Sequence, residues 1–186
     1  ALAGIDVVPE AVESTRQRGF QCLARASVMR LPFPDGAFDI VTSMDVLYIQ
    51  GVDDLAALHE MWRVMRPGGL LLLNLPAFEF LRGAHDVAIR TRHRYRRAEV
   101  EAMLSGTGYQ IELLSYWNMT LLPVVALARW LSRIAPHGEA TSDFRPLPGA
   151  MSSVLKWLIR GEVYSLRWFP LPAGVSIFAV ARKVDE

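Results

Sequence analysis

The chain has 186 residues, of which 52% are hydrophobic and 21% are charged. This hydrophobic content excludes intrinsic disorder, and a net charge of +1 excludes nucleic-acid binding through an overall basic field. A single cysteine excludes a disulfide framework and a multi-cysteine zinc site, so we expect no metal and a reducing, cytoplasmic location. The strongly apolar stretch at 121–128 is shorter than the ~20 residues of a spanning helix.

The chain begins at Ala1, directly ahead of an expected strand, without an initiator methionine or a leader. We therefore expect a piece cut at its amino end, and the lack of a targeting signal carries little weight. Proline in the first turn and glycine after the last predict a helix at 9–18. Apolar residues at helical spacing predict another at 54–65, which Arg66-Pro67-Gly68-Gly69 should end. Short strands are expected at 2–5, 20–24, 38–43 and 70–75.

The second half continues with a helix at 98–105 and strands at 109–117 and 175–182, and two apolar helices at 121–134 and 150–162 flank a loop at 136–149. The alternation predicts an α/β fold, a Rossmann-like and mostly parallel sheet with helices on both faces. We expect this fold to be truncated at the N-terminus, with a helical insertion before the last strand. The single domain 1–186 would comprise a core at 1–117, an insertion or lid at 118–173 and a closing strand at 174–183.

Ligands of an open parallel sheet bind at the carboxyl ends of its strands. Asp6 follows the first expected strand, where a carboxylate can accept hydrogen bonds from vicinal ribose hydroxyls. The alternative is that Asp6 caps the helix at 9–18.

Four stretches of the sequence occur in an order that is more specific than any of them alone. They are GIDVVPEA at 4–11, LPFPDGAFDIV at 31–41, DVL at 45–47 and EMWRVMRPGGLLLL at 60–73. With these motifs the chain resembles the class I methyltransferases that use S-adenosylmethionine. The resemblance extends to about residue 117, and the strand at 175–182 is similar to the closing strand of the family.

The resemblance implies that S-adenosylmethionine is the cofactor and that Asp6 binds its ribose hydroxyls. It places Val7 against the adenine, and Met44 and Asp45 near the methionine part. Ser27 and Val28 stand where the family usually has an Asp-Ala pair that reads the adenine amino group.

Three departures from the family pattern bear on function. Ser27 replaces the usual carboxylate, which weakens the adenine contact or routes it through water or backbone. Tyr48-Ile49 replace a common Glu-His pair, and we assign Tyr48 to the substrate. The first strand and Gly-rich turn of the family would fall before residue 1, so the chain lacks the backbone that cradles the methionine end.

Histidines and arginines gather in the segment 83–97. His85, beside Asp86, and His93 are the acid-base candidates, against the alternative of solvated loop residues. Five arginines surround Tyr95. Arg92 and Arg94 are predicted to bind an anionic group of the substrate, and the alternative is an exposed face balanced by acids of the next helix, Glu99 and Glu101. RNA binding is not expected, because Tyr95 is the only aromatic residue in the run.

The remaining candidates receive structural interpretations. His59 is expected on the surface, Cys22 as a buried small hydrophobe in a strand, and Met61 with Trp62 in the core. The two apolar helices are expected to pack on the sheet, with a lid, a homodimer interface or a peripheral membrane contact left open.

The sequence thus predicts methyl transfer to a small-molecule or lipid-like acceptor. Two alternatives stay open at this point. One is a non-catalytic binding or assembly protein on a methyltransferase fold, and the other is a nucleotide-cofactor oxidoreductase on a similar sheet.

Overall fold

The computed structural model describes residues 2–134, 149–166 and 168–184. Its strands form two separate sheets, a two-stranded sheet in the order β1-β2 and a four-stranded sheet in the order β3-β4-β6-β5. The strands are β1 (Gly4–Asp6), β2 (Leu23–Arg25), β3 (Phe38–Met44), β4 (Met65–Pro76), β5 (Tyr109–Trp117) and β6 (Ser176–Lys183). The helices are α1 (Pro9–Gln17), α2 (Asp54–Val64), α3 (Ala84–Ala88), α4 (Arg97–Gly106), α5 (Leu122–Ile134) and α6 (Gly149–Ser165), with 3-10 turns η1 (Glu79–Leu81) and η2 (Met119–Leu121).

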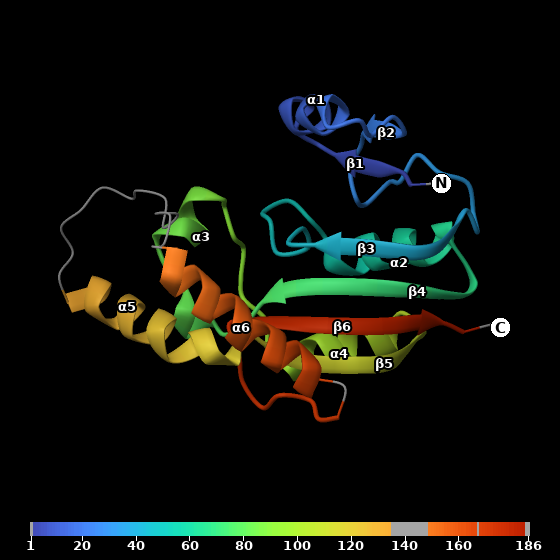
Figure 1. Ribbon diagram of the computed structural model, residues 1–186. Coiled ribbons are helices and arrows are strands. Elements are labelled where there is room, and N and C mark those ends of the chain that lie inside the picture. Colours follow the sequence, from blue (N-terminus) through green and yellow to red (C-terminus); the bar gives the residue numbers. More distant parts are fainter. Residues whose placement is uncertain (1, 135–148, 167, 185–186) are drawn as a thin grey trace.

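The strand directions show why the carboxyl ends of β3, β4 and β5 share one edge of the four-stranded sheet. β1 runs parallel to β2, and β3 runs parallel to β4. β6 is antiparallel to both β4 and β5, so β5 has the direction of β3 and β4. In Figure 1, β1 lies between β2 and β3, and its unpaired edge faces β3. This is the Rossmann-like α/β fold that the sequence predicts, and it is built in two sheets.

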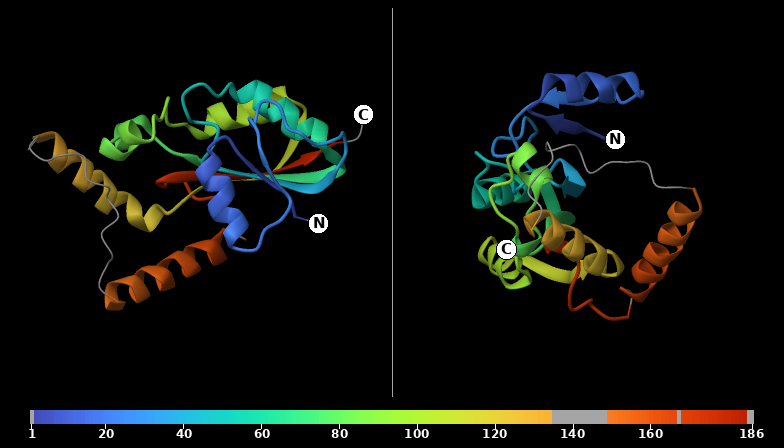
Figure 2. Two further views of the ribbon diagram at one scale, coloured as in Figure 1. Left: turned by 90° about the horizontal axis from the view of Figure 1, so that it is seen from above. Right: turned by 90° about the vertical axis from the view of Figure 1, so that its left-hand side faces the viewer.

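The hydrophobic core lies between the four-stranded sheet and the helices α2 and α4. Figure 2 shows these two helices on one side of the sheet, with α1 and α6 on the other. Alternate residues of the central strands point into this core, since Leu71, Leu73 and Leu75 of β4 are buried with Ile177 and Ala179 of β6. Met61 is buried and Trp62 packs edge-to-face on Tyr109, which confirms both as core residues.

Local sequence explains where α2 and β4 begin. The Asp53 carboxylate accepts a hydrogen bond from the amide of Ala56 at 2.9 Å and thereby caps α2. β4 begins at Met65, before the expected break, because the chain continues extended through Pro67 and Gly69 as a bulge against β3. A side chain on Gly69 would come within 3.1 Å of the Asp39 carbonyl oxygen, which explains a glycine at this approach.

Several expectations from the sequence are corrected. Cys22 is exposed and lies outside β2, which begins at Leu23 because residues 20–22 follow the turn at Gly19. The arginine-rich segment does not balance its charge on Glu99 and Glu101 alone, since Arg92 and Arg94 pair with aspartates of α2 and α3. The sequence also missed α3, whose five residues give almost no periodic signal. The expected loop at 136–149 lies outside the described residues apart from Gly149.

Candidate active site

The first part of the site is a small pocket beside the carboxyl end of β1. Val7, Arg25, Ala26 and Ser27 line a cavity of about 230 Å³. Asp6 is exposed next to it, and its Oδ1 accepts a hydrogen bond from the amide of Val8 at 2.8 Å. This contact orients the carboxylate within a turn ahead of α1, and it leaves Oδ2 as an acceptor for a hydroxyl. The Ser27 hydroxyl accepts from the amide of Met29, so its own proton remains a donor.

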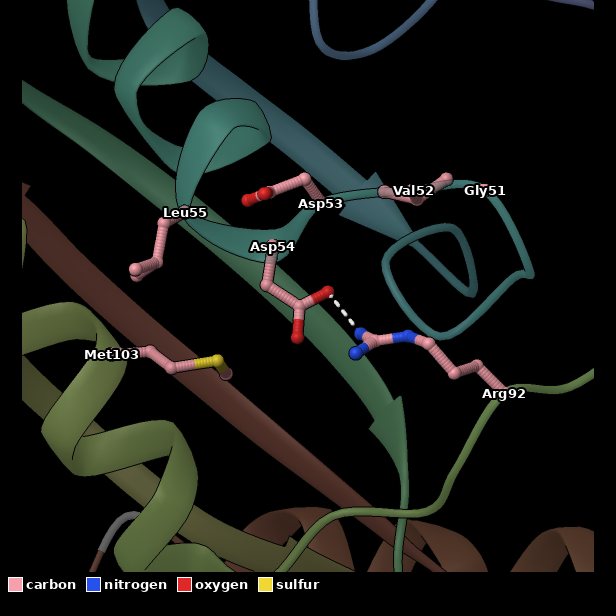
Figure 3. A pocket seen from close by; sticks show the side chains of 7 residues that line it. All are labelled: Gly51, Val52, Asp53, Asp54, Leu55, Arg92 and Met103. Carbon is pink, nitrogen blue, oxygen red and sulfur yellow. Dashed lines mark hydrogen bonds and ion pairs between the residues drawn. The ribbon is translucent and has the colours of Figure 1, made fainter.

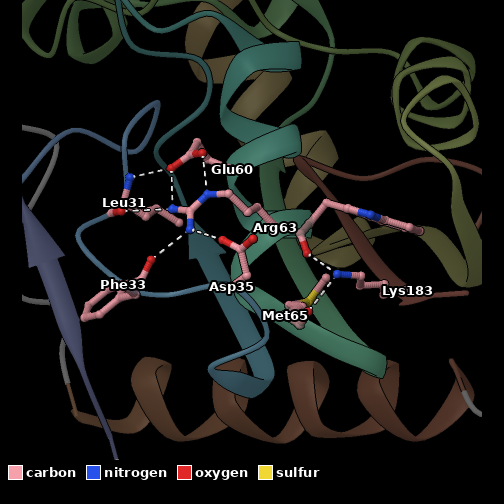
Figure 4. A network of polar contacts seen from close by, with 8 residues as sticks. Leu31, Phe33, Asp35, Glu60, Arg63, Met65 and Lys183 are labelled. Carbon is pink, nitrogen blue, oxygen red and sulfur yellow. Dashed lines mark hydrogen bonds and ion pairs between the residues drawn. The ribbon is translucent and has the colours of Figure 1, made fainter. Parts of the chain in front are cut away.

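Arg63 of α2 holds the loop that follows this pocket. As Figure 4 shows, its guanidinium donates to the carbonyl oxygens of Leu31 and Phe33 and pairs with Glu60 and Asp35. Glu60 also accepts from the amide of Leu31 at 2.7 Å. The hydrogen bond from Arg63 is the main cause that lowers the pKa of Glu60 to about 2. The network connects the β1-β2 sheet to the body of the protein.

A chain of three polar side chains crosses the carboxyl ends of β3, β4 and β5. The indole N–H of Trp117 donates to Oδ1 of Asn74 at 2.8 Å, and Nδ2 of Asn74 donates to the Asp45 carboxylate at 2.9 Å. Asp45 follows β3 with a left-handed φ of 59°, which a non-glycine residue rarely adopts. Desolvation raises the pKa of Asp45, and the hydrogen bond from Asn74 opposes this rise. Asp45 therefore presents its carboxylate at the edge of the sheet where ligands bind, and its backbone conformation and the hydrogen bond from Asn74 restrict its orientation.

Tyr48 lies close to this carboxylate and is buried. Burial raises the pKa of its phenol to about 12, with further contributions from the negative charges of Asp45 and Asp86. The phenol therefore keeps its proton at neutral pH and can act as a hydrogen-bond donor. The backbone carbonyl of Tyr48 accepts a hydrogen bond from the amide of Arg92. This contact fixes the segment after β3 beside the arginine-rich segment 90–97.

Arg94 and Asp86 form a buried ion pair at this edge. Arg94 Nε lies 2.9 Å from Asp86 Oδ1, and the two side chains are only 9% and 3% exposed. Burial raises the pKa of Asp86, but the hydrogen bonds from Arg94 and from the amide of Gly83 outweigh this effect and hold the pKa below its ordinary value. Arg94 also donates to the carbonyl of Ala77, directly after β4. The charge of Arg94 is thus balanced within the protein by Asp86.

Arg92 lines a second, larger pocket of about 470 Å³. Figure 3 shows that the side chains of Arg92 and Asp54 meet in an ion pair of 2.6 Å at this pocket, while Met103 of α4 lies on the other side of Asp54. The second oxygen of Asp54 accepts from the hydroxyl of the fully buried Tyr95. Because the Arg92 side chain is 40% exposed, it can still meet an anion from solution.

The two histidines lie in the same segment and are half-buried. The His93 ring packs on Tyr95, with centroids 4.2 Å apart. His85 is the second residue of α3, next to Asp86. His59 is exposed on α2, as the sequence predicts. Within the described residues, no cluster of histidine, cysteine or acidic side chains could hold a metal ion.

The structure brings Met44, Asp45 and Tyr48 to one edge with Arg94, whereas Asp6, Val7 and Ser27 lie at the carboxyl ends of β1 and β2. Val28 contacts the hydrophobic core and is partly buried. The sequence missed Asn74 and Trp117, although both stand near the ends of predicted strands, where polar groups are a signal for a site. It also missed Asp54 and Asp86 as partners of the arginines, because contacts across 38 and 8 positions leave no local pattern.

The chemistry of the first pocket fits the adenosine half of S-adenosylmethionine. Asp6 offers a carboxylate oxygen for the ribose, Val7 is 58% exposed beside the pocket as an apolar surface for a base, and Ser27 offers a hydroxyl. Asp45 is the acidic group of the neighbouring sheet at the same edge of the molecule.

Comparison with known proteins adds to this geometry. Residues 1–73 match the methyltransferase domain family. A demethylmenaquinone methyltransferase of Deinococcus radiodurans is 38% identical over 81 residues, which are 40% of this chain and 33% of that protein. The matched part thus spans about a third of the length of this curated relative.

Two solved structures share the fold over nearly the whole chain. One is a complex between the Haloferax volcanii Trm112 methyltransferase activator and a methyltransferase. A chain of this complex matches with a TM-score of 0.61 and 18% identity, over 98% of this chain and 71% of that chain. The other is phosphoethanolamine N-methyltransferase 2 of Haemonchus contortus, solved with S-adenosyl-L-methionine. Its TM-score is 0.56 at 15% identity, over 98% of this chain and 43% of that chain.

Proposed function

Because the chain belongs to the class I S-adenosylmethionine-dependent methyltransferase family, we propose that the protein transfers a methyl group from S-adenosylmethionine to a small-molecule or lipid-like acceptor. The observation that carries the proposal is the pocket at the end of β1, where Asp6, Val7 and Ser27 combine a carboxylate, an apolar surface and a hydroxyl. The similarity to a demethylmenaquinone methyltransferase supports an acceptor of this class.

In this proposal the chain holds the cofactor from both sheets. Asp6 accepts hydrogen bonds from the ribose hydroxyls, Val7 covers the adenine, and Ser27 with Val28 lies beside its amino group. Met44 and Asp45 approach the methionine end from β3. When bound, S-adenosylmethionine supplies a methyl group activated by its positively charged sulfur, and the ionised form of Asp45 favours a positive charge nearby.

Methyl transfer is an in-line displacement that needs alignment and the exclusion of water more than it needs an acid or a base. Tyr48, whose phenol is protonated at neutral pH, serves as a donor that orients the acceptor. Arg92 binds an anionic group of the acceptor, with Arg94 at the same edge. If the acceptor must lose a proton, His85 or His93 accepts it.

A non-catalytic binding protein on the same fold is the rival function. It is favoured by one specific observation, that Ser27 stands at a position where a carboxylate would read the adenine. Such a protein would keep the architecture of the site and bind the cofactor weakly or not at all. The oxidoreductase alternative draws no support from the likeness to the methyltransferase domain family.

Isothermal titration calorimetry separates these functions. The chain, and a second version extended at its amino end by about forty residues carrying a strand and a Gly-rich turn, are titrated with S-adenosylmethionine, S-adenosylhomocysteine and NADH. We expect the extended chain to bind the two methyltransferase ligands and to ignore NADH. Binding of NADH alone, or of no ligand by a folded extended chain, would contradict the proposed function.

A further inference from the structure

The helix α6 exposes large aromatic side chains to solvent. Trp157 is 73% exposed and Tyr164 is 63% exposed, and they are joined just beyond the helix by Trp168 at 68% and Phe169 at 72%. Trp157 and Tyr164 are seven positions apart, which places them on one side of α6, and Trp168 and Phe169 follow after the helix ends at Ser165. We call these four residues the aromatic strip. Large exposed aromatic side chains that gather in one part of a protein surface mark an interaction site.

A second exposed apolar surface runs along α5. Partly buried Leu122, Val125 and Arg129 are on the side that contacts the protein, where the Arg129 guanidinium lies against Gly83. The other side is apolar and exposed at Val124, Leu127, Trp130, Leu131 and Ile134. In the left view of Figure 2, α5 extends beyond the end of the four-stranded sheet and α6 lies apart from it.

The exposed charges beside the aromatic residues in the described part of α6 are positive. Lys156 and Arg160 are exposed on α6, one residue before and three residues after Trp157. Glu162 is the only acidic residue in the described parts 118–134, 149–166 and 168–173, and it is buried. Its carboxylate accepts hydrogen bonds from the amides of Met119 and Thr120, so its charge anchors α6 at the start of α5 instead of facing solvent.

We propose that α5 and α6 form a docking surface for an anionic lipid bilayer. Tryptophan and tyrosine favour the boundary between acyl chains and head groups, because their rings are apolar and their N–H or O–H groups stay hydrated. Lysine and arginine beside them meet anionic head groups, each contributing to binding at the membrane surface.

The contact is peripheral. No helix among the described residues is long and apolar enough to cross a membrane. Helices with an apolar face and a cationic border lie in the plane of the interface instead. α5 follows β5 after the short turn η2, at the edge where Asp45 and Trp117 lie, so the bound bilayer would be near the candidate active site.

Vesicle sedimentation tests the proposal on the whole chain without any cofactor, so its outcome is independent of methyl transfer. The protein is mixed with phosphatidylcholine vesicles, with or without about 30% phosphatidylglycerol, and the bound fraction is measured. We expect strong binding only to the anionic vesicles, and its loss in about 0.5 M NaCl. Replacing Trp157→Ser together with Trp168→Ser should weaken binding at least about tenfold.

A second double variant separates charge from apolar burial. Lys156→Gln with Arg160→Gln should weaken binding to anionic vesicles about fivefold per residue and leave the weak binding to neutral vesicles unchanged. Phe20→Ser is the matched control, since Phe20 is an exposed aromatic outside α5 and α6 and its loss should change nothing. Circular dichroism verifies that each variant is folded.

Two outcomes would overturn the proposal. The first is a folded wild-type chain that sediments with neither type of vesicle, or double variants that bind as the wild type does. The second is a dimer, detected by light scattering, that the tryptophan double variant dissociates while the wild type ignores vesicles. The covering surface would then be a second copy of the chain.

Discussion

The side-chain amide of Asn74 connects Asp45 to Trp117, donating to the carboxylate at 2.9 Å and accepting from the indole at 2.8 Å. Asp45 directly follows β3, whereas Asn74 lies in β4 and Trp117 ends β5. The three side chains nevertheless form one continuous hydrogen-bonded chain along the ligand edge. Asn74 can serve both neighbours because an amide offers an acceptor and a donor at once. The orientation of Asn74 thereby sets the electrostatic surroundings of Asp45.

We predict that Asn74→Ala raises the pKa of Asp45 further. Desolvation already raises this pKa, and the variant removes the hydrogen bond that opposes the rise. Carbon-13 NMR titration of the aspartate carboxyl groups, with Asp45→Asn for assignment, measures the shift. Gln110→Ala on exposed β5 surface is the control and should leave the titration as it is. A lowered or unchanged Asp45 pKa in Asn74→Ala would rule out the amide as the stabilising donor.

Asp6→Ala in the amino-terminally extended chain should weaken binding of S-adenosylmethionine by about 1.5–3 kcal/mol, the range of hydrogen bonds to a charged group. Calorimetry measures the change, and Glu10→Ala on α1 is the matched exposed carboxylate that should bind normally. Unchanged affinity in a folded Asp6→Ala protein would remove Asp6 from the cofactor site.

The two arginines of the predicted substrate clamp should respond differently to replacement by glutamine. Arg94→Gln leaves Asp86 buried without its partner, so we expect the free energy of unfolding to fall by about 3–5 kcal/mol. Arg94→Gln with Asp86→Asn should recover much of this loss. Arg92→Gln breaks a more exposed pair and should cost less than about 1 kcal/mol. Urea unfolding of the four proteins measures these values, and equal losses for both single variants would contradict the distinction.

Because Arg92→Gln should remain folded, it also tests the substrate role. If Arg92 binds an anion on the acceptor, the KM of the active enzyme rises in this variant and becomes less sensitive to salt. Identical KM values for wild type and variant, at both low and high salt, would exclude the clamp.

Glu60 should make the protein sensitive to acid. Its pKa in the folded protein is about 2, below the ordinary 4.5, so its ionised form stabilises the folded state. This stabilisation is complete above pH 4.5 and is lost as the pH falls from 4.5 towards 2. Since the Arg63 partner is partly exposed, we expect the contribution to be about 1–2 kcal/mol. Glu60→Gln should flatten the acid branch of the stability curve, whereas a parallel curve would assign the sensitivity to other groups.

The facing edges of β1 and β3 predict the effect of an added strand. Ile40 and Met44 of β3 are about half exposed there, and an unpaired apolar edge invites association between molecules. Compared with an amino-terminally extended chain, we expect residues 1–186 to be less soluble and to unfold with a broader transition. The amino-terminal extension should give a cooperative transition that S-adenosylmethionine raises. A sharp transition for residues 1–186, raised by the cofactor, would contradict this expectation.

Periodic segments of the sequence predict the fold well. The helices α2 and α4 and the strand β5 lie within one residue of their expected bounds, because amphipathic spacing and glycine stops are local signals. The short β2 and the five-residue α3 are not fixed by such signals, and the sequence misplaced the first and missed the second.

Prediction of the site from the sequence has the same limit, because only local signals can be read from the chain. Strand ends predicted Asp6 and Asp45, because ligand positions follow from the topology of a parallel sheet. Asn74 lies inside a run of leucines that reads as a buried strand, and its partners are 29 and 43 positions away. Only the pairing of β3, β4 and β5 around β6 brings these side chains together.

The division into two sheets has a consequence for how the protein opens. The β1-β2 sheet is joined to the rest chiefly through the loop that Arg63 and Glu60 hold, so it can unfold as a unit of its own while β3 to β6 remain intact. Amide hydrogen exchange in β1 and β2 should therefore be faster than in the central strands. A ligand that contacts Asp6 in one sheet and Asp45 in the other would merge the two units into one, and the difference in exchange protection would shrink when it binds.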